Sequence, residues 1–175
     1  MTATLLERAR AVRLLLLDVD GVLTDGSLFL GDDGEQYKAF HSRDGHGIRL
    51  LQDSGVDVGI LTGRQSRVVE HRCRELGIRP ILQGRRDKKD ALHELLDIAG
   101  VGPEETAYMG DDIVDLPVMR RVALGLAVAD AHPLVREHAH HVTTLGGGRG
   151  AVREACELIM DAQGTLQATL APYLE

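Results

Sequence analysis

Short apolar runs alternate with amphipathic stretches along most of the chain. Each run ends in charged or turn residues, as buried strands of a parallel sheet do. The runs occupy residues 12–17, 56–61, 80–82, 106–109 and 124–128. Apolar side chains recur at helical spacing beside charged ones in residues 47–51, 68–76, 91–98 and 113–121. The alternation predicts an α/β fold, a Rossmann-like three-layer arrangement around a doubly wound parallel sheet.

One segment interrupts this alternation. Residues 27–30 and 35–41 have strand character and flank the turn sequence Gly31-Asp32-Asp33-Gly34, which predicts a short β-hairpin over residues 27–41. The hairpin is too short to form a cap domain. If a large substrate has to be shielded from water, we expect a neighbouring subunit to help. The chain should end in a helix over residues 151–162 and a tail over 164–175, all within a single domain spanning 1–175.

Composition narrows the possible ligands. Apolar residues make up 43% of the chain, enough for one sizeable core, whereas aromatic residues make up only 3%. This scarcity argues against base-stacking surfaces for nucleic acid. The formal charge of −7 would repel nucleic acid and anionic membranes, so we expect neither as a partner. An anionic small molecule would require a local cluster of cationic side chains.

The cysteines and the first residues bear on location. Cys73 and Cys156 lack metal-ligand spacing and should be free thiols packed as small hydrophobic groups, which suits a reducing compartment. Glu7, Arg8 and Arg10 interrupt the apolar residues near the N-terminus, so neither a signal peptide nor a membrane span is expected. These features predict a cytoplasmic protein.

Carboxylates collect where two of the predicted strands end. The sequence Asp18-Val19-Asp20-Gly21 follows the first strand, and Asp111 and Asp112 follow the fourth. Alone, Asp18 and Asp20 are equally typical of a hydrogen-bonded turn. Because parallel strands end at one edge of the sheet, however, these acids should meet there and repel one another unless a cation binds. Oxygen ligands without nitrogen or sulfur favour Mg²⁺.

Two further polar residues fall at the same edge. Thr62 follows the second strand, and Lys88 begins the helix after the third. Individually, Thr62 is compatible with a helix cap, Lys88 with a solvated cation, and the acids with N-caps. Together, a threonine and a lysine that face a bound cation form a site for a phosphate group.

These motifs resemble, in order and spacing, the four motifs of the haloacid dehalogenase superfamily of phosphatases. They are Asp18-x-Asp20-Gly-Val-x-Thr, Thr62-Gly63, Lys88 and Gly110-Asp111-Asp112-x-x-Asp115. Longer runs, among them residues 40–48 and 147–154, resemble the family of 3-deoxy-D-manno-octulosonate 8-phosphate phosphatases, and the similarity spans about residues 10–163. The resemblance implies a capless, Mg²⁺-dependent homotetramer of lipopolysaccharide precursor biosynthesis, with the hairpin of one subunit near the next subunit's site.

The resemblance also implies roles for individual residues. Asp18 would attack phosphorus and form an aspartyl-phosphate, while Asp20 would protonate the departing sugar oxygen and later deprotonate water. Magnesium would be held by the Asp18 carboxylate, the Asp20 backbone carbonyl and Asp111, with Asp112 as an alternative ligand. The phosphoryl oxygens would be held by Thr62, Gly63 and Lys88.

Arginines are the candidates for binding the carboxylate of a sugar acid. Arg64 directly follows the Thr62-Gly63 turn, whereas Arg43 and Arg149 lie on segments that a neighbouring subunit could contribute. For Arg149, simple surface charge explains the residue equally well. A separate histidine group lies beyond the fifth strand, away from the acidic edge, and should be structural or solvated: His132, His138, His140 and His141.

Two other functions fit parts of the pattern. A phosphatase for nine-carbon sialic-type 9-phosphates would share all four motifs, although Arg64 favours the eight-carbon substrate. A phosphoaccepting receiver domain also gathers aspartates, a threonine and a lysine at a sheet edge. In this sequence, Asp20 lies two residues after the nucleophile and is placed to promote hydrolysis. An inactive assembly partner is disfavoured because all four motifs are intact.

Overall fold

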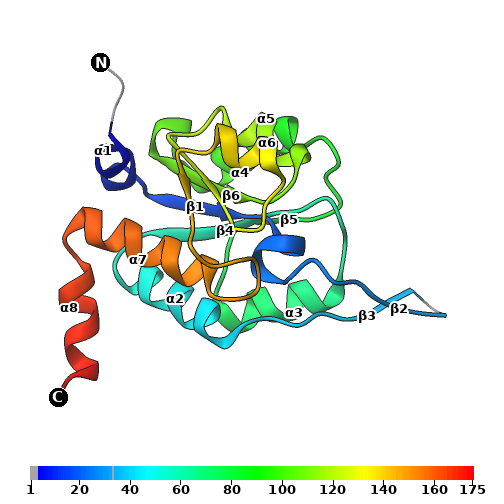
Figure 1. The fold of residues 1–175 in the computed structure, drawn as a ribbon, viewed down its shortest axis with the longest axis horizontal. Coiled ribbons are helices and arrows are strands. Elements are labelled where there is room, and N and C mark those ends of the chain that lie inside the picture. Colours follow the sequence, from blue (N-terminus) through cyan, green and yellow to red (C-terminus); the bar gives the residue numbers. More distant parts are fainter. Residues whose placement is uncertain (1–3, 33) are drawn as a thin grey trace.

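The computed structural model describes residues 4–32 and 34–175, and its centre is a six-stranded sheet in the order β5-β4-β1-β6-β7-β8 (Figure 1). All of its recorded strand pairings are parallel. The chain extends the sheet from central β1 first in one direction and then in the other, which confirms the doubly wound α/β prediction. The strands are β1 (Leu14–Leu17), β4 (Asp57–Leu61), β5 (Ile81–Leu82), β6 (Thr106–Gly110), β7 (Leu124–Ala127) and β8 (His141–Val142).

Helices cover both faces of this sheet, as the three-layer prediction requires (Figure 1). One face carries α2 (Ser42–Asp53), α3 (Arg67–Leu76) and α7 (Ala151–Gln163), and α1 (Leu5–Arg10) packs against α7. The opposite face carries α4 (Lys88–Ala99), α5 (Leu116–Met119) and α6 (Pro133–His138). In the described part of the chain no helix has both the length and the apolar character needed to cross a bilayer.

Several elements differ from the sequence-based expectation. The helix predicted over 113–121 is a 3₁₀ turn, Ile113–Asp115, followed by α5, because Pro117 is favourable only in the first turn of a helix. The strand β8 and the short helices α1 and α6 were not predicted. The expected tail contains α8 (Leu166–Leu170) and a 3₁₀ turn, Ala171–Tyr173.

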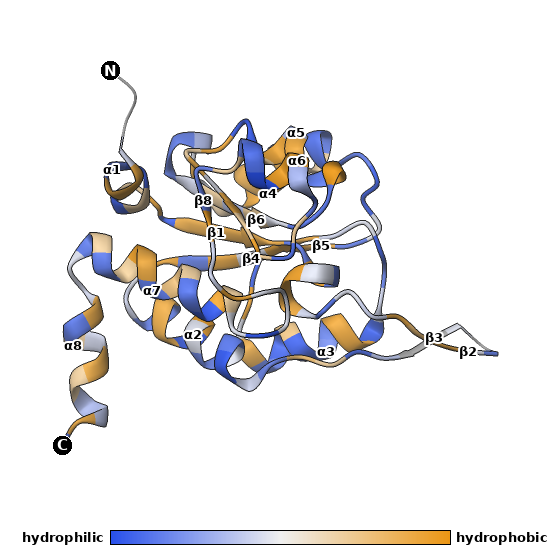
Figure 2. Cartoon of the chain, in the orientation of Figure 1, coloured by the Kyte–Doolittle hydropathy of each residue, from blue (hydrophilic) through white to orange (hydrophobic). Residues whose placement is uncertain are grey.

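The core is built around the central strand. All four leucines of β1 are completely buried, and the hydropathy colouring shows β1 and β4 as a continuous apolar layer (Figure 2). Covering helices turn apolar faces toward this layer. Because β1 is surrounded on every side, its carboxyl end is held rigidly, and Asp18 is the next residue.

The hairpin projects from one end of the molecule, while α8 lies at the other (Figure 1). The strands of the hairpin, β2 (Phe29–Gly31) and β3 (Gly34–Tyr37), pair antiparallel and are shorter than predicted. Asp33, in the predicted turn, lies outside the described residues. The side chains of Phe29, Leu30 and Tyr37 are mostly exposed. The hairpin therefore offers an apolar surface to solvent or to a partner.

A buried carboxylate connects α2 to the start of α7. Asp44 accepts hydrogen bonds from the backbone N–H groups of Gly150 (3.3 Å) and Arg153 (2.8 Å). The glycine-rich loop before α7 packs directly on the segment after β1, since a Cβ on Gly147 would lie only 1.8 Å from the carbonyl oxygen of Gly21. Asp44 thus secures the loop that supports the residues following Asp18.

We expect Asp44→Ala to lower the free energy of unfolding by about 1–3 kcal/mol, because two N–H groups at the start of α7 would lose their acceptor. Urea unfolding measures the change. The matched control is Asp97→Ala on the exposed side of α4, which should alter stability by less than about 0.5 kcal/mol. Equal stabilities for the two variants would contradict this role for Asp44.

Candidate active site

The segment after β1 forms a tight turn that places two aspartates at the sheet edge. Asp18 accepts a hydrogen bond from the N–H of Val19 (2.7 Å), and the chain continues into a π-helical turn, Val19–Leu23. Gly21 has a φ of +89°, and a Cβ there would lie 2.1 Å from a carboxylate oxygen of Asp111. Glycine is therefore required both by the backbone conformation and by the approach of Asp111.

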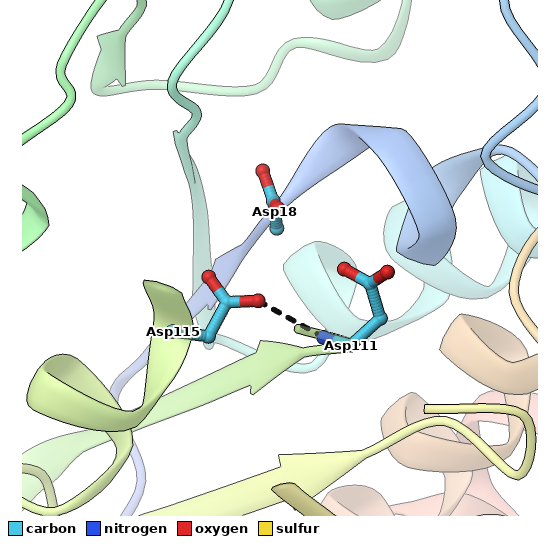
Figure 3. Close-up of side chains that lie close together, drawn as sticks. All are labelled: Asp18, Asp111 and Asp115. Carbon is cyan, nitrogen blue, oxygen red and sulfur yellow. Dashed lines mark hydrogen bonds between the residues drawn. The ribbon is translucent and has the colours of Figure 1, made fainter. Parts of the chain in front are cut away.

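Three carboxylates meet at this edge. Oxygens of Asp18, Asp111 and Asp115 lie within 4.8 Å of one another (Figure 3). Asp115 is fully buried, and both of its oxygens already accept hydrogen bonds. The donors are Lys88 Nζ (2.6 Å), Tyr108 OH (2.6 Å) and the backbone N–H groups of Asp111 (3.0 Å) and Asp112 (3.2 Å). Asp115 therefore organises the cluster. Asp18 has one partner on each oxygen, Val19 N–H and Lys88 Nζ, and the structure gives the Asp111 carboxylate no hydrogen bond within the described residues, so these two acids are the ones placed to bind a cation.

The acids of this cluster are short of compensating positive charge. Burial raises the pKa of Asp18 to about 6, although the nearby Lys88 opposes the shift. Burial, together with the carboxylates of Asp115 and Asp18, raises the pKa of Asp111 to about 7. A bound divalent cation would remove this repulsion, and oxygen donors in this number and charge fit Mg²⁺. The residues present therefore suit the ion predicted from the sequence.

Lys88 is the cation that faces Asp18 in the described structure. It is the first residue of α4, its side chain is buried, and its Nζ lies 2.9 Å from Asp18 and 2.6 Å from Asp115. Burial alone would lower the pKa of Lys88, but the two carboxylates outweigh burial and raise it. The ammonium group is therefore charged where a phosphoryl group would approach Asp18.

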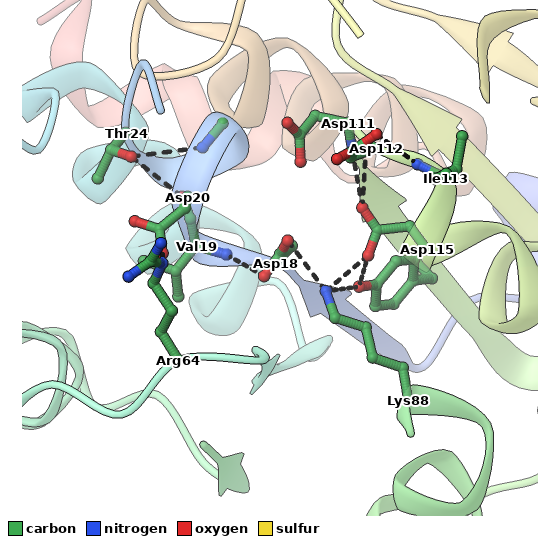
Figure 4. Close-up of polar contacts among 12 residues, drawn as sticks. Asp18, Val19, Asp20, Thr24, Arg64, Lys88, Asp111, Asp112, Ile113 and Asp115 are labelled. Atoms are coloured by element: carbon green, nitrogen blue, oxygen red, sulfur yellow. Dashed lines mark hydrogen bonds and ion pairs between the residues drawn. The ribbon is translucent and has the colours of Figure 1, made fainter. Parts of the chain in front are cut away.

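Asp20 lies in a different electrostatic setting. One of its oxygens pairs with Lys38 Nζ, and the other lies 3.6 Å from Arg64 Nε. Asp20 and Arg64 lie on one side of Asp18, while Lys88 and Asp115 lie on the other (Figure 4). The two aspartates of the Asp18-x-Asp20 motif thus have separate cationic partners.

A cavity of about 300 Å³ opens over these groups, a volume suited to a small phosphate ester. Leu28, at the base of the hairpin, contributes to its wall. The structure brings together eight of the residues predicted for the site: Asp18, Asp20, Thr62, Gly63, Arg64, Lys88, Asp111 and Asp112. Asp112 caps the following 3₁₀ turn through Ile113 N (2.7 Å), so its role as a metal ligand stays a prediction.

Two predicted arginines lie outside this cavity. Arg43 is exposed on the first turn of α2, and Arg149 pairs with Asp25 at 3.1 Å with 68% of its side chain exposed. Within one chain neither lines the cavity, so their contact with substrate stays a prediction that depends on a second subunit.

Histidines beyond β7 have local structural partners. His140 Nδ1 accepts a hydrogen bond from Gly125 N (2.9 Å), and His132 Nδ1 accepts one from Leu134 N (3.2 Å). Both contacts agree with the structural interpretation of this group.

Sequence reasoning missed three contributors. Asp115 belongs to the motif Gly110-Asp111-Asp112-x-x-Asp115, and its spacing from Asp111 could have indicated that both residues lie in one site. Tyr108 precedes that motif on β6, where strand alternation could have indicated the direction of its side chain. Lys38 carried no signal of its own, because only the folded hairpin brings it to Asp20.

The family model for haloacid dehalogenase-like hydrolases matches residues 78–150. Over 166 residues, the chain is 50% identical to 3-deoxy-D-manno-octulosonate 8-phosphate phosphatase of Escherichia coli K12, covering 95% of this chain and 88% of the relative. The Yersinia pestis enzyme of the same name is 52% identical over 162 residues, covering 93% and 87% of the two chains.

Solved structures resemble the chain equally well. The crystal structure of the Yersinia pestis phosphatase superimposes with a TM-score of 0.90 at 52% identity, covering 93% of this chain and 88% of that one. The Moraxella catarrhalis phosphatase, in complex with magnesium, phosphate and a KDO molecule, superimposes with a TM-score of 0.93 at 40% identity and covers 97% of both chains. Magnesium binding is thus a property of a relative with the same fold.

We expect Mg²⁺ to stabilise the protein more at pH 8 than at pH 5. The pKa of Asp111 rises from 3.8 to about 7 on folding. Between these two pH values the folded apoprotein therefore holds a proton that the unfolded chain has lost. Stability of the apoprotein should therefore fall as the pH rises through this range, and Mg²⁺, which needs the deprotonated acid, should restore the loss. Thermal unfolding with and without Mg²⁺ measures both effects.

Two matched variants test the same charge balance. Asp111→Asn should be more stable than the unsubstituted apoprotein at pH 8, yet it should lose most of the Mg²⁺-induced rise in Tm. Asp112→Asn should keep that rise if Asp112 only caps the 3₁₀ turn, and should lose it if Asp112 is a direct ligand. An unchanged Mg²⁺ effect in Asp111→Asn would disprove the proposed site.

Proposed function

The chain belongs to the family of 3-deoxy-D-manno-octulosonate 8-phosphate phosphatases, within the haloacid dehalogenase-like hydrolases, and from this premise we propose its substrate and mechanism. The proposed reaction is hydrolysis of 3-deoxy-D-manno-octulosonate 8-phosphate to the free sugar acid and inorganic phosphate. One observation carries the proposal: Asp18 lies beside both Asp111 and Lys88 at the sheet edge, in a chain that is 50% identical to such a phosphatase over 95% of its length.

The reaction proceeds in two displacements. An oxygen of Asp18 attacks phosphorus, the bond between phosphorus and the sugar oxygen breaks, and Asp20 gives that oxygen a proton. In the second displacement, water attacks the aspartyl-phosphate and Asp20 takes a proton from it, which releases phosphate and regenerates Asp18. Asp20 can serve in both displacements because it loses a proton in the first and gains one in the second.

Residues of this chain also hold the transferred group. Lys88 and the hydroxyl of Thr62, with the backbone N–H of Gly63, would bind the phosphoryl oxygens on which negative charge spreads. The Asp18 carboxylate, the Asp20 backbone carbonyl and Asp111 would hold Mg²⁺, with Asp112 as an alternative ligand. When bound, the ion neutralises phosphoryl charge and orients the phosphorus toward Asp18.

Recognition of the sugar acid would use arginine and a second subunit. Arg64 lines the cavity with about half of its side chain exposed, so its guanidinium can reach a carboxylate distant from the phosphate. We propose a homotetramer in which the exposed apolar hairpin of one subunit covers the site of another, where Arg43 or Arg149 could then contribute. Residues 1–175 would act as one domain in the cytoplasm, in lipopolysaccharide precursor synthesis.

The alternatives differ in how they relate to this assignment. Membership in a family of phosphatases replaces the receiver-domain interpretation, since receivers store the acyl phosphate. The nine-carbon 9-phosphate is a competing substrate, which relative rates on the two esters distinguish.

We expect Asp18→Asn to reduce turnover at least about 10³-fold, because an amide oxygen cannot form the covalent intermediate. Lys88→Ala should reduce turnover to a similar extent, because the phosphoryl oxygens lose their cationic partner. Phosphate release under saturating Mg²⁺ measures both, and circular dichroism should show an intact fold. Asp90→Asn, exposed on α4, is the matched control and should retain full activity. Substantial turnover by Asp18→Asn would exclude this mechanism.

Initial rates over a panel of phosphate esters test the substrate. We expect kcat/KM to be highest for the eight-carbon 8-phosphate, at least about tenfold above simple hexose phosphates, because the latter lack a carboxylate for Arg64. Arg64→Ala should remove most of this preference. A higher kcat/KM for a nine-carbon 9-phosphate would replace the proposed substrate with that ester.

A further inference from the structure

Lys38 is a lysine outside the four motifs, and its side chain is buried. It follows β3 where the chain leaves the hairpin, and only 1% of its side chain is exposed. Lysine is rarely buried this completely unless its charge is paired. Its ammonium group pairs with an oxygen of Asp20, the residue that transfers protons in the proposed reaction.

The two cations beside Asp20 differ in how firmly they are held. Arg64 approaches the second oxygen of Asp20 at 3.6 Å, and 53% of the Arg64 side chain is exposed. An exposed arginine at this distance places little constraint on the carboxyl group and can turn toward substrate. The buried ammonium of Lys38 has less freedom, so Lys38 is better suited to fix Asp20.

The positive charges of the site are also divided by role. Lys88 contacts Asp18 and Asp115, on the side of the nucleophile opposite Asp20 (Figure 4). Lys88 therefore serves the phosphoryl group, and its contacts give Asp20 no support. Among the described ion pairs of Asp20, the buried one comes from the hairpin.

We propose that Lys38 is a positioning residue that holds the carboxyl group of Asp20 for proton transfer to the departing oxygen; the idea rests on the proposed phosphatase function. As the bond between phosphorus and the sugar oxygen breaks, the proton moves from Asp20 to that oxygen. Asp20 becomes a carboxylate beside the ammonium of Lys38. The same pairing then holds this carboxylate for the attacking water.

This role predicts a dependence on the leaving group. A sugar alkoxide is a poor leaving group and needs the proton from Asp20, whereas p-nitrophenolate departs without one. Displacing Asp20 should therefore slow formation of the aspartyl-phosphate from the sugar ester and leave formation from p-nitrophenyl phosphate largely unchanged. Loss of phosphate binding would slow both.

The test uses Lys38→Met in the full-length protein with saturating Mg²⁺. We expect kcat/KM to fall about 10²-fold for the sugar 8-phosphate and less than about fivefold for p-nitrophenyl phosphate. The parameter kcat/KM reports only steps up to release of the alcohol, so the second displacement does not obscure the comparison. The ratio of the two values is also independent of the fraction of protein that is folded.

Two controls make the outcome specific. Asp20→Asn should show the same leaving-group pattern, and adding Lys38→Met to it should cause little further loss, because both substitutions remove one function. Lys89→Met, on the exposed surface of α4, should leave the kcat/KM values for both substrates unchanged. Equal losses on both substrates, no loss on either, or additive losses in the double variant would overturn the proposal.

Failure of the proposed substrate would be recognised separately. If the unsubstituted protein hydrolyses p-nitrophenyl phosphate but not the sugar 8-phosphate, the substrate assignment is wrong. The Lys38→Met comparison is then made with whichever alkyl phosphate the protein does hydrolyse, and the same selective loss is expected.

Discussion

Repulsion among the closely spaced carboxylates at the end of the central strands is the constraint on which the site depends. Asp18, Asp111 and Asp115 are held within 4.8 Å of one another, although like charges at this distance oppose folding. Asp115 is satisfied by four hydrogen bonds, and Lys88 bridges it to Asp18. Asp111 has less compensation for its negative charge, and burial and the neighbouring carboxylates raise its pKa. The fold thus maintains an arrangement that a cation and a phosphate ester complete.

Rigid packing is what holds these charges together. Buried β1 fixes the position of Asp18, and the turn after it can approach Asp111 only because residue 21 has no side chain. The glycine-rich loop before α7 supports that turn from the other side, and Asp44 secures the loop. The charges that line the cavity are therefore positioned by contacts that are mostly apolar or made by the backbone.

The sequence predicted most of what local pattern and strand order determine. Apolar runs located the main strands, and the rule that parallel strands end at one edge of the sheet predicted that Asp18, Thr62 and Asp111 lie together. Short elements such as β8 and α6 were missed because two to six residues do not establish a period. The pairing of Lys38 with Asp20 was missed for a different reason, since it depends on where the folded chain places the end of the hairpin relative to the turn after β1.

The hairpin borders two environments at once. Leu28 lines the cavity, whereas the next residues, Phe29 and Leu30, face outward. Because the hairpin lies between β1 and α2, its exposed tip can change in length and sequence without disturbing a strand of the central sheet. Changes confined to the tip leave Lys38 beside Asp20, so the part of the hairpin that faces outward is separable from the part that contacts the site.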